Sequence, residues 1–143
     1  MAKVFERILI ATDGSDNNMP AVKKGLELAR GSGADLFVVF VVDETSFLAS
    51  QMDVLPDYVY TTLRNEGEKA VEHIKEMAGD LTIQTVVLSG QPAQAITEFA
   101  TKNKIDLIVV GSHGKTGIEK LLLGSVAEKI LRLADCMVLV VKK

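Results

Sequence analysis

Apolar and polar residues alternate along this chain in blocks of two kinds. Runs such as Leu36–Val42 are continuously apolar, rich in β-branched residues and too short for a buried helix, so they predict strands covered on both faces. Longer segments between them place apolar residues at helical spacing. The predicted strands are Val4–Thr12, Leu36–Val42, Thr82–Leu88, Ile105–Val110 and Met137–Val141.

The intervening segments predict helices. The first has Pro20 in its first turn and ends near residues 31–33, where glycine can take a left-handed cap. The longest spans Asp57–Ala78, and a shorter one follows Pro92. Residues 45–56 have no clear period, which leaves a locally packed loop, a lid or a subunit contact as interpretations.

The region before the last strand contains two capping signals. Thr116-x-x-Glu119 and Ser125-x-x-Glu128 both have the Ser/Thr-x-x-Glu form. They predict a short helical piece at residues 117–123 and a separate helix from Val126 to about Ala134, with Ser125 as its N-cap. Alternating strands and helices of these lengths predict one doubly wound α/β domain over residues 1–143, with three layers (α/β/α) and five parallel strands.

Composition narrows the functional classes. The chain has 143 residues, a formal charge of −3 and one cysteine, Cys136. The acidic balance gives no electrostatic reason to expect nucleic acid as a partner. A single cysteine forms no intrachain disulfide, the longest apolar run is far short of a membrane span, and no targeting segment is evident. We therefore expect a soluble, cytoplasmic protein without a membrane partner.

The main chemical motif is a set of small residues after the fourth predicted strand. It reads Gly111-x2-Gly114-x9-Gly124-Ser125 and joins a buried strand to a helix, where α/β folds bind phosphate. Glycine lets backbone amides turn toward an anion. Each residue alone has a structural explanation as a turn or cap, but the combination favours a nucleotide-phosphate loop. A P-loop would need glycine at Val109, so that motif is excluded.

Other polar residues fall on the same rim of the predicted sheet. Asp13 follows the first strand and either binds a ribose hydroxyl or Mg²⁺, or simply orders a turn or caps a helix. His113 lies in the glycine loop; we interpret it as a solvent-facing histidine, because no nucleophile–base pair is evident within reach. Two histidines and one cysteine without close spacing predict no zinc site.

These features resemble the universal stress protein family along essentially the whole chain. The resemblance rests on the segment Ile8–Ser15, on Val38–Asp43, on Gly90-Gln91-Pro92, on the glycine-and-serine spacing and on Val138–Val141. It implies the sheet order 3-2-1-4-5 and a homodimer. The full spacing is similar to that of the branch of the family that binds nucleotides. Two departures are Phe40, where histidine is frequent, and Met137, where proline commonly precedes the last strand.

The resemblance also implies a set of binding residues for ATP or AMP. Asp13 would lie near ribose, phosphate or a Mg²⁺ held through the phosphates, Thr12 and Val41 would line the adenine pocket, and the loop residues would hold ribose and phosphates. The full predicted set is Ala11, Thr12, Asp13, Val41, Val110, Gly111, Ser112, His113, Gly114, Gly124, Ser125 and Val126.

Three functions remain open from the sequence. The first is an adenine-nucleotide-binding stress-response regulator with an unidentified protein partner; no catalytic residue is predicted. The alternatives are a slow Mg-dependent ATP hydrolase or phosphotransferase, and an interaction scaffold independent of nucleotide. If the last strand is an edge, its apolar row would be buried by pairing with a second copy. The predicted dimer contact is Met137, Val138, Leu139, Val140 and Val141.

Overall fold

The computed structural model describes residues 3–45, 56–114 and 123–143. Within these residues, five parallel strands form one sheet in the order β3-β2-β1-β4-β5. The α/β class and the strand order implied by the family resemblance are both confirmed. The strands are β1 (Arg7–Thr12), β2 (Asp35–Asp43), β3 (Ile83–Gly90), β4 (Leu107–Gly111) and β5 (Met137–Val141).

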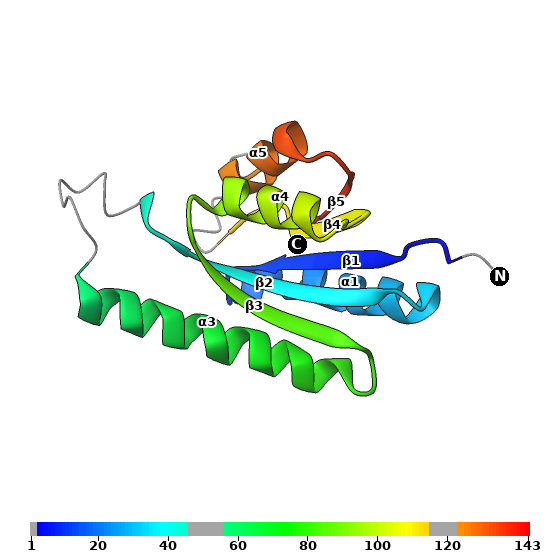
Figure 1. Ribbon diagram of the computed structural model, residues 1–143, viewed down its shortest axis with the longest axis horizontal. Helices are drawn as coiled ribbons and strands as arrows, with labels where there is room; N and C mark the ends of the chain where they lie inside the picture. Colours follow the sequence, from blue (N-terminus) through cyan, green and yellow to red (C-terminus); the bar gives the residue numbers. More distant parts are fainter. Residues whose placement is uncertain (1–2, 46–55, 115–122) are drawn as a thin grey trace.

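Helices cover both faces of this sheet (Figure 1). One face packs against α1 and α3, and the other against α4 and α5. A 3₁₀ turn, η1, precedes α1. The bounds are η1 (Asp16–Asn18), α1 (Met19–Ser32), α3 (Asp57–Ala78), α4 (Pro92–Lys102) and α5 (Ser125–Leu133). The predicted helical piece at residues 117–123, its Thr116-x-x-Glu119 signal and most of the 45–56 connection lie outside the described residues.

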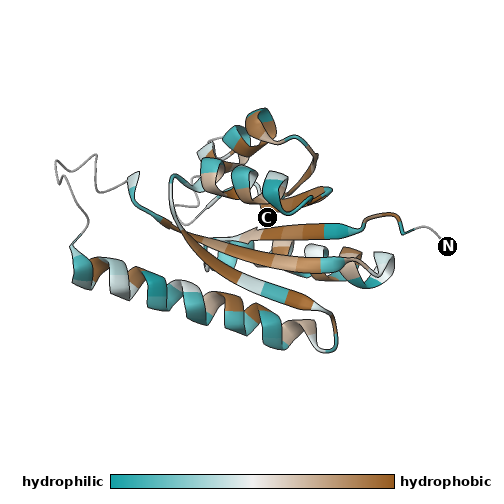
Figure 2. Ribbon diagram, in the orientation of Figure 1, coloured by the Kyte–Doolittle hydropathy of each residue, from teal (hydrophilic) through white to brown (hydrophobic). Residues whose placement is uncertain are grey.

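The core consists of two apolar layers, one on each side of the sheet. Alternate residues of β1 point to opposite faces, so Ile8 and Ile10 join the layer under α1 and α3, whereas Leu9 and Ala11 join the layer under α4 and α5. The strands are therefore apolar along their length, while the helices alternate apolar and polar faces (Figure 2). This two-sided burial is the physical reason that continuous apolar runs predicted the strands correctly.

The start of β1 differs from the prediction. The strand begins at Arg7 rather than Val4, and Val4 is exposed. The Asp106 carboxylate accepts hydrogen bonds from the main-chain amides of Glu6 and Arg7, at 2.8 and 3.0 Å. These bonds tie the start of β1 to the residue just before β4, and pairing with β2 begins at Arg7, opposite Asp35.

Phe40 fixes the distance between α3 and the sheet. A Cβ placed on Gly67 of α3 would lie 2.6 Å from Phe40 Cδ1, so the helix sits on the ring at a position where only glycine fits. The far edge of the same ring lies 3.6 Å from the corresponding position on Gly14. Phe40 is therefore a core residue packed below the loop after β1.

None of the helices in the described parts of the chain combines the length and apolar character needed to cross a bilayer.

Candidate functional site

The strand order reverses between β1 and β4. The chain runs outward from β1 through β2 to β3, then returns to place β4 on the other side of β1. Loops that leave the carboxyl ends of β1 and β4 consequently turn away from each other toward opposite halves of the sheet. Open α/β sheets bind ligands in the crevice formed there, and both Asp13 and Gly111 lie at these strand ends.

Asp13 orders a tight turn after β1. Its Oδ1 accepts hydrogen bonds from Ser15 N at 2.9 Å and Ser15 Oγ at 2.6 Å, and Thr12 Oγ1 accepts one from Gly14 N at 3.1 Å. Gly14 has φ +78°, a left-handed conformation that favours glycine. The Asx-turn interpretation of Asp13 is confirmed. Since only Oδ1 is engaged in this turn, Oδ2 is left to face the loop after β4.

The motif glycines are required by close approach. None of Gly111, Gly114 and Gly124 has a positive φ. Instead, a Cβ on Gly114 would lie 3.2 Å from Asp13 Oδ2, and a Cβ on Gly124 would lie 3.0 Å from Ser112 O and 3.3 Å from His113 Cα. The missing side chains let three loops converge at one point of the sheet edge.

The start of α5 differs from the predicted capping box. Gly124, with φ −68° and ψ 159°, is the N-cap, and Ser125 is the first helical residue; no side chain caps the helix. The Gly124 amide donates to Ser112 O at 2.6 Å, which holds Gly124 extended, and Glu128 N donates to Gly124 O at 3.0 Å. Glu128 instead pairs with Arg132 at 3.6 Å.

This start leaves α5 with open donors. The amides of Ser125, Val126 and Ala127 donate to no described residue, because the first helical hydrogen bond comes from Glu128. Open amides and the positive end of the helix dipole are the features that attract anions to helix N-termini in general. The serine–glycine spacing was a useful signal, although the capping role assigned to Ser125 was wrong.

Ser112 and His113 form a contact that sequence reasoning did not find. Ser112 is buried, and its Oγ lies 3.1 Å from His113 Nδ1. His113 is half-buried, so its imidazole is partly covered and not fully exposed to solvent as the sequence suggested. Neighbours in a continuing strand point to opposite faces, but β4 ends at Gly111, and the bend brings the two side chains together.

The other predicted residues lie at or just below the rim. Ala11, Thr12 and Val110 are buried, so the two apolar side chains belong to the core. Val41 is half-buried, and the β1–β2 register places it one step beyond the Thr12–Phe40 pair, beside Asp13. Val126 is exposed at the start of α5.

Two asparagines on η1 were missed as site residues. Asn17 Nδ2 donates to Gly114 O at 3.2 Å, and Asn18 is buried against Gly111. Neither residue was among those predicted to bind. Their position immediately before α1, in a loop on the same rim, was the available signal.

Acidic and metal-ligating side chains do not gather here. Across residues 3–45, 56–114 and 123–143, no group of three or more His, Cys, Asp or Glu side chains could hold a metal ion. Asp13 provides a single carboxylate, so a Mg²⁺ ion at this rim would need phosphate oxygens as further ligands.

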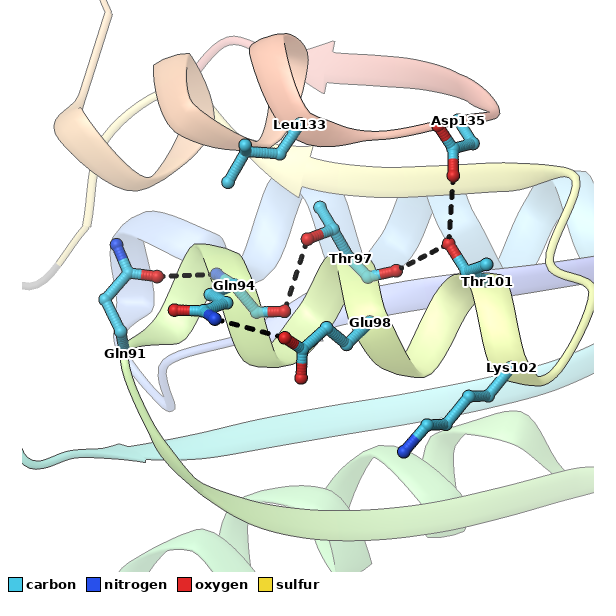
Figure 3. Close-up of a pocket in the computed structure, with 8 residues that line it drawn as sticks. All are labelled: Gln91, Gln94, Thr97, Glu98, Thr101, Lys102, Leu133 and Asp135. Atoms are coloured by element: carbon cyan, nitrogen blue, oxygen red, sulfur yellow. Dashed lines mark hydrogen bonds between the residues drawn. The ribbon is translucent and has the colours of Figure 1, made fainter.

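A groove of about 690 Å³ lies elsewhere, between α4 and α5 (Figure 3). Its polar groups largely satisfy one another: Gln91 Oε1 accepts from Gln94 N at 2.6 Å, and Thr101 Oγ1 donates to Asp135 Oδ2 at 3.3 Å. The groove contains none of the predicted site residues. It is lined by Gln91, Gln94, Thr97, Glu98, Thr101, Lys102, Leu133 and Asp135.

The fold and the rim define a doubly wound α/β protein in which a helix begins beside the strand-order switch point. The model of the universal stress protein family matches residues 5–142. The chain therefore belongs to the universal stress protein family.

Individual proteins are similar over nearly the full length. Universal stress protein MJ0531 of Methanocaldococcus jannaschii is 42% identical over 142 residues, which cover 98% of this chain and 84% of that protein. The structure of MJ0577 from the same organism matches with a TM-score of 0.85 and 28% identity, covering 96% of each chain. A universal stress protein solved in complex with cAMP matches with a TM-score of 0.68 and 27% identity, covering 96% of this chain and 97% of that one.

Proposed function

We propose that this protein binds an adenine nucleotide, ATP or AMP, at the rim formed by the ends of β1 and β4, and acts as a stress-response regulator. The observation that carries the proposal is the open start of α5. The amides of Ser125, Val126 and Ala127, which donate to no described residue, lie beside a loop whose glycines leave no side chain between the backbone and an anion. Amides and helix dipole act on phosphate together, the dipole contributing about 0.3–1 kcal/mol at an exposed site.

Each predicted residue takes a role in this proposal. The phosphates bind the amides of Ser125 and Val126, beside the Gly111–Gly114 segment. Asp13 Oδ2 accepts a ribose hydroxyl or supplies one oxygen to a Mg²⁺ ion that the phosphates complete. The adenine lies over Val41 and the end of β1. The relative solved with cAMP, an adenine nucleotide, supports this choice of base.

The proposal is tested by identifying and titrating the nucleotide. Freshly purified protein is heat-denatured, and the released small molecules are identified by mass spectrometry; nucleotide-stripped protein is then titrated calorimetrically with ATP, AMP and GTP. We expect adenine nucleotide with a dissociation constant in the micromolar range or tighter and a weaker response to GTP. No binding of either adenine nucleotide would refute the proposal.

We also propose that the protein is a homodimer through β5. This strand forms an edge of the sheet, since it pairs with β4 on one side and with no other described strand. Met137 is 64% exposed, and the following apolar residues are only half-buried. An apolar edge strand is a template for further pairing. A second copy related by a two-fold axis would cover it without leaving a new edge.

A slow ATP hydrolase is the second candidate. The Ser112–His113 contact supports it, because it holds an imidazole at the rim in a fixed orientation. Steady phosphate release over many turnovers, lost in Asp13→Asn, would favour hydrolysis. The asparagine oxygen can keep both hydrogen bonds from Ser15, so this variant removes the charge while retaining the turn. Nucleotide binding without turnover would leave the regulatory function.

A further inference from the structure

Asn18 contains a buried amide oxygen without a partner. The residue is 4% exposed, and across the described residues its Oδ1 is the buried side-chain nitrogen or oxygen that lacks a hydrogen bond. Buried polar atoms in native proteins almost always have a partner, and leaving one unpaired destabilises the fold. Leucine has a similar shape and would fill the same space without burying a polar atom. The buried oxygen therefore has no donor among the described residues in this conformation.

Asn18 lies directly behind the proposed phosphate loop. Its Nδ2 is 3.0 Å and its Cα 3.7 Å from the position that a Cβ would occupy on Gly111. The neighbouring Asn17 donates from Nδ2 to Gly114 O at 3.2 Å. The two asparagines of η1 thus contact the first and last residues of the Gly111–Gly114 segment.

We propose that Asn18 is a positioning residue for nucleotide binding, whose Oδ1 accepts a hydrogen bond from a main-chain amide of the Gly111–Gly114 segment when phosphate is bound. This inference rests on the proposed nucleotide site. The Gly114 amide donates to no described residue, so the segment has a donor to offer. A small peptide rotation that accompanies phosphate binding pairs the buried oxygen.

The energetic consequence is a coupling between the two events. An interaction made only in the bound state contributes to affinity, whereas the same unpaired oxygen lowers the stability of the unbound protein. Replacing it by an apolar group of similar shape should therefore have opposite effects on stability and binding. A residue with a purely structural role would lower stability and leave affinity unchanged.

The test compares Asn18→Leu with Thr97→Val in nucleotide-stripped protein. Thr97 is also a buried polar residue, but its hydroxyl donates to Ala93 O within α4, away from the rim. We expect Asn18→Leu to melt at or above the wild-type temperature and to bind ATP and AMP about tenfold more weakly by calorimetry, which corresponds to about 1.4 kcal/mol. Thr97→Val should bind both nucleotides like the wild type.

Wild-type affinity in Asn18→Leu would overturn the inference while leaving the proposed function intact. If the melting temperature of that variant also fell, the oxygen would be assigned to a buried structural water. Absence of binding by the wild type would instead overturn the proposed function and this inference with it.

A measurement on the unmodified protein covers the case in which the variant does not fold. The side-chain amide resonances of Asn18 and Asn103 are followed by NMR as AMP is added. Asn103 Nδ2 donates to Phe99 O at 2.9 Å, far from the rim, and serves as the internal control. We expect the Asn18 resonances to shift and those of Asn103 to stay in place. An unmoved Asn18 at saturating AMP would contradict the proposal.

Discussion

Replacing Gly124 by alanine tests whether the empty space at this residue forms the binding site. The new Cβ would meet Ser112 O at 3.0 Å and His113 Cα at 3.3 Å. Both are backbone atoms, which cannot rotate away as the end of a long side chain would. The two segments must therefore separate by a few tenths of an ångström, although the φ of −68° at Gly124 is itself acceptable for alanine.

The separation should affect binding more than folding. Overpacking of this kind lowers the free energy of unfolding by about 1–3 kcal/mol. The reduced conformational freedom of the unfolded chain with alanine offsets about 0.4–1 kcal/mol of this loss. The fold should survive with a moderately lower melting temperature. The same shift strains the Gly124 N to Ser112 O hydrogen bond of 2.6 Å, which joins the start of α5 to the loop. Loss of one charge-assisted bond to phosphate costs about 1.5–3 kcal/mol, a roughly ten- to hundredfold weaker affinity.

The control is Gly31→Ala in the last turn of α1, where an added Cβ has no atom within 4 Å. This change should raise stability by about 0.5–1 kcal/mol and leave binding unaltered. Thermal unfolding by circular dichroism and calorimetric titration with ATP and AMP measure both quantities on both variants. Wild-type affinity in folded Gly124→Ala would refute the argument that convergence of these loops creates the site.

Three further changes follow from the contacts described above. Gly67→Ala should lower the free energy of unfolding, measured with urea, by about 1–3 kcal/mol, because its Cβ would lie 2.6 Å from the Phe40 ring. Adding Phe40→Leu should recover part of this loss, and equal losses with and without Phe40→Leu would argue against that contact. Met137→Lys should convert a dimer to a monomer in light scattering, whereas Tyr58→Lys, at a similarly exposed position on α3, should not; a dimer in both would exclude β5 as the interface. Burial raises the pKa of the Cys136 thiol, and the charge of a nearby carboxylate adds to the effect, so iodoacetamide should modify it more slowly at pH 8 than a free cysteine and faster as pH rises; a rate equal to that of free cysteine would contradict this.

Strands and long helices were predictable because the pattern of apolar residues within each element reflects which of its own residues are buried. The bounds of α3 (Asp57–Ala78) and β5 (Met137–Val141) agree with the predictions, and the other described elements differ by a few residues at their ends. Those ends depend on partners distant in sequence. The Asp106 carboxylate, which accepts from the amides of Glu6 and Arg7 at the start of β1, is about a hundred residues away along the chain. No local pattern around Val4 contains that information.

Most of the predicted site residues lie at or just below one rim of the sheet, but their local structural roles were harder to predict. The capping role predicted for Ser125 was wrong, because Gly124 is the N-cap and its amide is held by Ser112 O. The contribution of η1 was missed because its contacts with the loop after β4 are distant in the sequence. Asn17 reaches Gly114 across 97 positions in the sequence, so only the folded chain brings the two together.

The glycines of the rim divide into two physical classes, and the division changes what substitution should do. Gly14 has φ +78°, so any other residue there is strained by backbone conformation. Gly111, Gly114 and Gly124 have ordinary backbone angles and are needed for the space beside them. The sequence argument assigned these three to conformational freedom, which would make asparagine the best-tolerated replacement because it accepts left-handed angles. Close approach predicts the opposite order: alanine, the smallest addition, should do least harm, and each larger side chain should weaken nucleotide binding further.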